Sequence, residues 1–182
     1  MSELKETQLE EETEETENID DIPIVEGGTP IDYSRYEGMR VQIAKVEKIE
    51  AINFYTGPIV GGKPSYNAES TEKCMKIEVT TKALLKLDDA GQPTQEKLTY
   101  FDSIKEEEVP ITVTARFNLK KVEGENGVVN WVISKTPRAN LWKAMRKLGV
   151  EKLSEMIGKL VTITTSPDKD PDSDKVWPRL VL

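Results

Sequence analysis

The sequence predicts a mainly β protein: a five-stranded barrel with one helix between its third and fourth strands, preceded by an acidic tail. Three observations lead to this prediction. Apolar and polar residues alternate in several segments between residues 39 and 133, as they do in half-buried strands. Near residue 140 the spacing of apolar residues becomes helical. Residues 1–30 carry eleven acidic residues and one basic residue.

The acidic segment has the composition of a disordered tail, because so few large apolar side chains cannot offset the entropy lost on ordering. Gly27, Gly28 and Pro30 mark its junction with the body, residues 31–182, which we expect to be one domain. The net charge of the 182-residue chain is −8, yet the tail alone accounts for −10. The body therefore carries only +2.

The first two predicted strands cover residues 39–52 and 74–87. In the first strand the alternation slips at residues 44–46, which indicates a bulge or strong coiling. The second strand alternates more regularly and leads into a long loop. The third strand, residues 111–121, is followed by a Gly-rich turn and a returning strand at residues 128–134.

A helix comes next, with Thr136 as its cap, Pro137 at its first position and Gly149 at its end. A short second helix is expected at about residues 151–157. Strands at residues 159–166 and 176–182 complete the body. Pro178 places part of the last strand at an edge or a bulge.

The sequence offers little for catalysis, because it contains no histidine, the commonest general base and metal ligand. Its single cysteine, Cys74, cannot form an intramolecular disulfide or build a structural zinc site. The aspartates at residues 168–174 lack the glycine and glutamate of a calcium-binding loop. We therefore expect a protein that is not an enzyme and that uses no cofactor or metal.

The same composition bears on location. No run approaches eighteen apolar residues, and the acidic start does not resemble a secretory signal. A lone cysteine suits a reducing compartment. These features predict a soluble cytoplasmic protein with no membrane partner.

The order of elements over residues 38–182 resembles the OB-fold, a five-stranded Greek-key barrel. That resemblance implies binding of single-stranded nucleic acid on the face of the second and third strands and on the loops beside them. Cationic side chains would contact phosphates, and aromatic rings would stack on bases. The candidate residues are Phe54, Tyr55, Lys63, Tyr66, Lys76, Arg116, Lys120, Lys121 and Trp131.

Two alternatives stay open at this point. Residues 116–147 contain eight basic residues and only two acidic ones. This excess of positive charge favours a polyanion as the partner. The basic residues are equally typical of a solvated helix face and hairpin. Trp131 has the same strand parity as Val129 and Ile133, so it is also consistent with a core position.

The segment Asp20, Asp21, Ile22, Pro23 and Ile24 is similar to the tip of bacterial single-stranded DNA-binding proteins, Asp-Asp-Asp-Ile-Pro-Phe. In that family the tip binds partner enzymes, and the acidic tail competes with DNA. Here the segment is internal and belongs to an N-terminal tail. The resemblance implies a tail that regulates binding or recruits protein partners.

The leading hypothesis is therefore a non-enzymatic protein that binds single-stranded nucleic acid, DNA before RNA, in replication, recombination or repair. The alternative is an OB-fold module for protein–protein interaction or assembly that binds no nucleic acid. The overall isoelectric point of about 4.8 favours that alternative. The sequence does not fix the oligomeric state.

Overall fold

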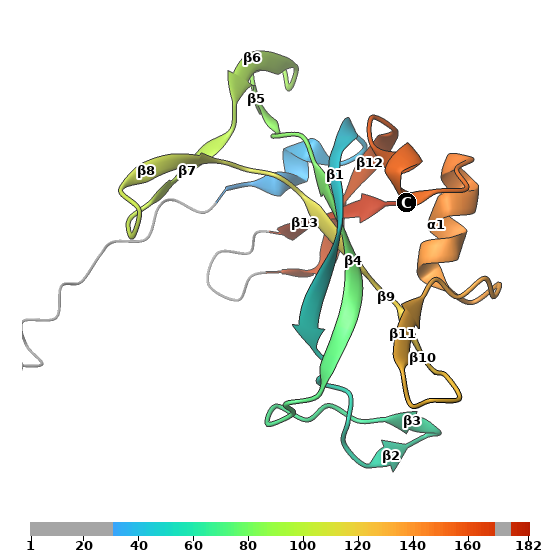
Figure 1. Ribbon diagram of the computed structural model, residues 1–182. Coiled ribbons are helices and arrows are strands. Elements are labelled where there is room, and N and C mark those ends of the chain that lie inside the picture. Colours follow the sequence, from blue (N-terminus) through green and yellow to red (C-terminus); the bar gives the residue numbers. More distant parts are fainter. Residues whose placement is uncertain (1–30, 170–175) are drawn as a thin grey trace, which may run out of the picture.

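The computed structural model describes residues 31–169 and 176–182, with only the backbone of residues 167–169 and 176. The described part of the body is mainly β with one α-helix, as predicted. Its largest sheet is antiparallel and has five strands in the order β13-β12-β1-β4-β9 (Figure 1). The predicted acidic tail, including residues 20–24, lies outside the described residues.

The five strands of this sheet are β1 (Arg40–Ile52), β4 (Lys73–Thr81), β9 (Thr114–Asn118), β12 (Leu160–Lys169) and β13 (Val176–Val181). Two smaller hairpins are β2 (Ile59–Val60) with β3 (Lys63–Pro64) and β5 (Leu85–Leu87) with β6 (Pro93–Lys97). Two more are β7 (Thr99–Asp102) with β8 (Glu107–Pro110) and β10 (Lys120–Glu123) with β11 (Val129–Val132). The helical elements are η2 (Tyr33–Tyr36), α1 (Asn140–Leu148) and η3 (Leu153–Met156).

Strand β1 pairs with two neighbours in succession. Residues 40–42 pair with β12, and residues 43–52 pair with β4. The register shifts between Ile43 and Lys45, which confirms the bulge predicted from the slip of alternation. At the bulge the Ile43 N–H donates to the carbonyl of Lys159 at 2.9 Å, and the N–H of Gly158 donates to the Ile43 carbonyl at 2.8 Å. The bulge therefore holds the segment that leads into β12.

The predicted barrel is wrong, because the sheet is open. Among the described residues no hydrogen-bonded ladder joins its edge strands, β9 and β13. The segment predicted as one strand at residues 111–121 is divided: Leu119 is buried in the core, and Lys120 begins a separate hairpin with β11. On the other edge, Pro178 has no N–H to give to any neighbouring strand.

Other predicted elements also need correction. Helix α1 begins at Asn140 after Ala139, without a side-chain cap, so Thr136 does not cap it. Gly149 ends the helix as predicted, in the left-handed region at φ 69°. The expected second helix is only the 3-10 turn η3. The long loop expected after residue 87 contains β6 and the β7–β8 hairpin.

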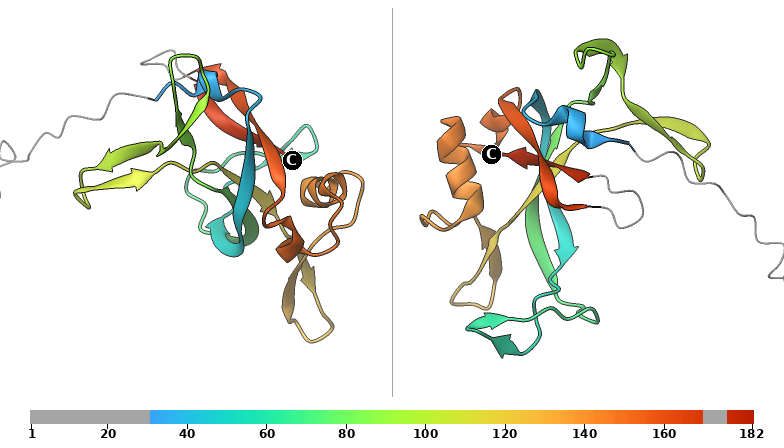
Figure 2. Two further views of the ribbon diagram at one scale, coloured as in Figure 1. Left: turned by 90° about the horizontal axis from the view of Figure 1, so that it is seen from above. Right: turned by 180° about the vertical axis from the view of Figure 1, so that it is seen from behind.

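Two clusters of buried side chains form the core. One joins β1 and β4 to α1 and η3, and includes Ile43, Ile77, Val79, Leu141, Met145 and Met156. The other joins η2 to segments near β4, β9 and β12, and consists of Tyr36, Leu84, Ile111, Val113 and Ile163. The views in Figure 2 place α1 on one side of the sheet and the β7–β8 hairpin on the other. Within the described part of the chain, no helix is long and apolar enough to cross a membrane.

The carboxylate of Glu37 links the end of η2 to β12 through hydrogen bonds. Its Oε2 accepts hydrogen bonds from the hydroxyl and the N–H of Thr165, at 2.8 and 2.7 Å. Its Oε1 accepts one from the Thr164 hydroxyl at 2.9 Å. These bonds, led by that of the Thr165 hydroxyl, lower the pKa of Glu37 from its ordinary value of 4.5 because they favour the charged carboxylate.

We expect Glu37→Gln to be less stable than the wild type at neutral pH and to lose less stability on acidification. A lowered folded-state pKa contributes stability above the unfolded-state value, and that contribution is lost as pH falls through the folded-state pKa. Urea unfolding between about pH 6 and about pH 3 should therefore show the two proteins converging. Glu125→Gln, in the exposed β10–β11 turn, is the matched control. A difference between wild type and Glu37→Gln that is constant with pH would contradict this linkage.

Candidate functional site

Most of the predicted binding residues lie at one end of the five-stranded sheet, where β1 ends and β4 begins. The β2–β3 and β10–β11 hairpins both project from this end (Figure 1). They are separated by more than 50 residues in the sequence. The fold therefore brings the aromatic loop after β1 close to the basic hairpin after β9.

Five of the nine predicted residues line one hollow of about 310 Å³: Phe54, Tyr55, Lys76, Lys121 and Trp131. Strand register explains why they meet. Lys76 lies opposite Asn118 in the β4–β9 pair, and Lys121 lies opposite Trp131 in the β10–β11 pair. Between these pairs the N–H of Leu119 donates to the carbonyl of Met75 at 3.0 Å. That bond joins the start of the hairpin to the sheet.

Three aromatic rings gather beside the hollow. The centroid of Tyr66 is 5.8 Å from that of Phe54 and 6.1 Å from that of Tyr55. Tyr55 and Tyr66 are more than 60% exposed and Phe54 is 40% exposed. The rings therefore contact one another but present much of their surface to solvent, which is the condition for stacking on a ligand.

Hydrogen bonds of Asn53, Asn67 and Ser70 hold this loop in shape. The Oδ1 of Asn53 accepts from the N–H of Tyr55 at 3.1 Å, which forms an Asx turn directly after β1. The N–H of Asn67 donates to the carbonyl of Phe54 at 2.6 Å. The hydroxyl of Ser70 donates to the carbonyl of Asn53 at 2.6 Å. These bonds fix the backbone that carries the rings, so little order remains to be gained when a ligand binds.

Trp131 has two roles in this geometry. It is half-buried and packs against the core cluster that contains Ile77 and Leu119. It also lines the hollow, next to Lys121. The surroundings of Trp131 therefore include both the core and the hollow, the two locations that its strand parity left open.

The lysines differ in their partners. No carboxylate of the described residues forms an ion pair with Lys63, Lys76 or Lys120. The Nζ of Lys121 lies 3.4 Å from Oε1 of Glu123. This ion pair is exposed, so it contributes little to stability. Lys63 and Lys120 are exposed but do not line the hollow.

Arg116 is the predicted residue that fits the site least. Its Nε donates to Oε2 of Glu78 at 2.7 Å, from the position directly opposite in the β4–β9 pair. It does not line the hollow. Its guanidinium already has a carboxylate partner, so it is less available to a phosphate than the lysines.

Four polar residues that line the hollow are absent from the nine predicted ones: Asn53, Glu72, Cys74 and Asn118. Asn53 carried a signal, because an asparagine between a strand and two aromatic residues is typical of a turn. Glu72 and Cys74 carried none, since only the pairing of β1 with β4 places them beside Phe54. Glu72 partly offsets the charge of Lys76 and Lys121.

The described residues contain no group of three histidine, cysteine, aspartate or glutamate side chains that could hold a metal ion. Residues 170–175 of the aspartate-rich loop lie outside them. No family model, no curated protein and no solved structure matches the chain. The geometry of the hollow and its rings is therefore the basis for assigning a function.

We expect Trp131→Ala to destabilise the protein by about 2 kcal/mol or more, because it removes a large side chain packed on the core. Tyr66→Ala should cost about 0.5 kcal/mol or less, since its ring lies mostly in solvent. Urea unfolding of the two variants measures both effects. Equal losses would show that the exposed rings belong to the core, and that the site is misplaced.

Proposed function

We propose that this protein binds single-stranded nucleic acid, without catalysing a reaction, on the surface at the β2–β3 end of the sheet. We call this the aromatic–lysine surface; it consists of Phe54, Tyr55, Lys63, Tyr66, Lys76, Lys120, Lys121 and Trp131. The observation that carries the proposal is the cluster of three exposed rings beside a hollow lined by Lys76 and Lys121.

Each part of this surface suits a single strand. An unpaired base offers its flat face to an aromatic ring, and such stacking contributes about 1–3 kcal/mol per base. In a duplex the neighbouring base pairs already cover those faces. Lysine ammonium groups attract the phosphates that follow the stacked bases. The amides of Asn53 and Asn118 in the hollow offer both donors and acceptors to base edges.

The charge of the body limits the strength of binding. A body of +2 that also carries Glu72 in the hollow attracts a polyanion weakly over long distances. Stacking must therefore supply much of the affinity. We infer DNA as the ligand, with a role in replication, recombination or repair, and a tail that regulates binding or recruits partners.

A second candidate function is protein–protein interaction, and one observation favours it. Two hairpins, β2–β3 and β7–β8, carry exposed apolar side chains: Ile59 is 74% exposed on β2, and Ile104 is 93% exposed between β7 and β8. Exposed apolar groups of this kind often mark contacts with another protein. Two results together would favour this candidate: no binding of nucleic acid in any assay, and binding of a protein through these two hairpins.

The first test is a titration of labelled single-stranded DNA and of its duplex, of about thirty nucleotides, at several salt concentrations. We expect tighter binding to the single strand. The logarithm of the binding constant should fall with the logarithm of salt by about 0.7 for each phosphate neutralised. No change in probe anisotropy at micromolar protein and low salt would contradict the proposal, and RNA of the same sequence tests the preference for DNA.

A second test separates stacking from charge. Tyr55→Ala and Tyr66→Ala should weaken binding while leaving the salt slope nearly unchanged. Lys76→Ala or Lys120→Ala should reduce the slope by about one unit or less. The matched controls lie on the β7–β8 hairpin: Tyr100→Ala for the rings and Lys105→Ala for the charges. If the controls weaken binding as much as the site variants do, the aromatic–lysine surface is not the interface.

A further inference from the structure

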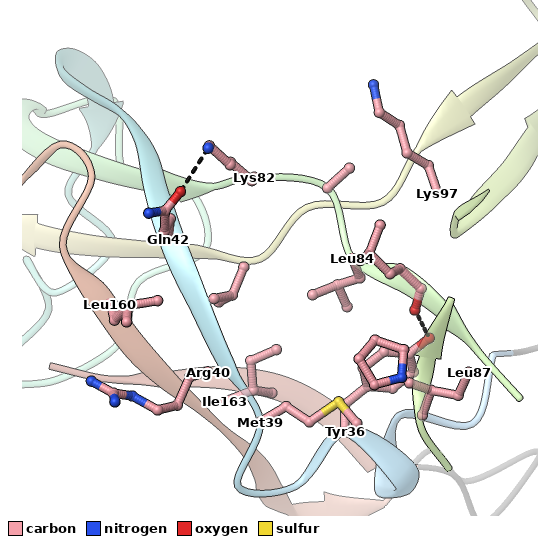
Figure 3. Close-up of a pocket in the computed structure, with 14 residues that line it drawn as sticks. Tyr36, Met39, Arg40, Gln42, Lys82, Leu84, Leu87, Lys97, Leu160 and Ile163 are labelled. Carbon is pink, nitrogen blue, oxygen red and sulfur yellow. Dashed lines mark hydrogen bonds between the residues drawn. The ribbon is translucent and has the colours of Figure 1, made fainter. Parts of the chain in front are cut away.

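A second and larger hollow, of about 640 Å³, lies near the opposite end of β1 (Figure 3). It is enclosed by the start of β1, the segment that follows β4, the β5–β6 hairpin and β12. Most of its lining is apolar, and includes Met39, Val41, Leu84, Leu87, Leu160 and Ile163. We call it the β1–β5 pocket. A volume and lining of this kind are those of a binding site.

The charged side chains that line the β1–β5 pocket are all positive. Arg40, Lys82 and Lys97 line it, and no aspartate or glutamate does. Figure 3 shows their cationic ends at the margins, with Leu84 and Ile163 inside. Lys82 donates to the Oε1 of Gln42 at 2.6 Å, a neutral partner that leaves its charge uncompensated. The pocket therefore suits an occupant that is apolar in the middle and acidic at its ends.

The sequence of this chain contains one such segment close by. Ile22, Pro23, Ile24 and Val25 are four consecutive apolar residues, with Asp20 and Asp21 before them and Glu26 after them. Proline restricts the backbone of the segment, which lowers the entropy lost when it binds. No other stretch of residues 1–30 has consecutive large apolar residues between acidic ones.

The described chain begins beside the pocket. Ile31 and Tyr33 pack against the core cluster that contains Tyr36, Leu84 and Ile163, and those three residues also line the pocket. Five residues separate Val25 from Ile31, and the six steps between these two residues reach about 20 Å when extended. Attachment through so short a link raises the local concentration of the segment to about the millimolar range.

From these observations we propose that the segment at residues 22–25 occupies the β1–β5 pocket of its own chain, with its flanking acids facing Arg40, Lys82 and Lys97. The site is distinct from the aromatic–lysine surface, because the two lie at opposite ends of β1. A strand of 13 residues spans about 40 Å. The anchored segment thus fixes where the rest of the acidic tail starts.

Methyl NMR of the full-length protein tests this directly and requires no nucleic acid. In the variant Ile22→Ser with Ile24→Ser, the methyl signals of Leu84, Leu160 and Ile163 should shift. Those of Leu141, in the other core cluster, should not. Unchanged pocket signals would overturn the proposal. Pocket signals that change on dilution of the wild type would also overturn it, because they would show that a second copy fills the pocket, for example with its β7–β8 hairpin.

A labelled peptide of residues 18–28 gives the affinity. If the peptide binds with a dissociation constant of about 0.1 mM, a local concentration of about 1 mM fills most pockets of the wild type. The full-length Ile22→Ser, Ile24→Ser variant should then bind the peptide about tenfold more tightly than the wild type does. Adding Lys97→Glu should weaken that binding, and Lys105→Glu, outside the pocket, should not. Equal binding to wild type and variant, or equal effects of the two lysine changes, would overturn the proposal.

Discussion

The structure depends on the exchange of partners along β1. One strand of 13 residues pairs first with β12 and then with β4, and the bulge at residues 43–45 lies at the exchange. Ile43, fully buried at this point, connects both halves of the sheet to the helix through the core cluster. Without the extra residue, the side chains after the bulge would point to the wrong face of the sheet.

The length of β1 also separates two chemically different surfaces. At its start lies the β1–β5 pocket, which is mostly apolar and whose charged lining residues are all cations. At its end lies a smaller hollow with exposed rings, two lysines and one glutamate. An apolar pocket favours a short apolar segment, whereas exposed rings favour flat, polar groups. The two surfaces therefore need not compete for the same ligand.

Local pattern predicted much of this arrangement. The slip of alternation revealed the bulge, and Gly149 marked the end of the helix, because both signals act over a few residues. Five of the residues that line the candidate hollow were among the predicted ones, since exposed aromatic and basic residues stand out where the core does not need them. The pattern could not show pairing between distant segments: that Lys120 belongs to a separate hairpin, or that Glu72 lines the same hollow as Lys76. The prediction of a barrel was wrong for that reason: closure depends on the pairing of two edge strands that are far apart in the sequence.

The open edges have a consequence for how the protein behaves among its own copies. An unpaired edge strand invites a strand from another molecule, and so promotes aggregation. On β13 the missing N–H of Pro178 and the charge of Arg179 oppose such pairing. On β9 the strand is only five residues long and carries Arg116 in its middle. The features that keep the sheet from closing thus also oppose strand pairing between copies, so that crowded molecules of this protein can remain separate.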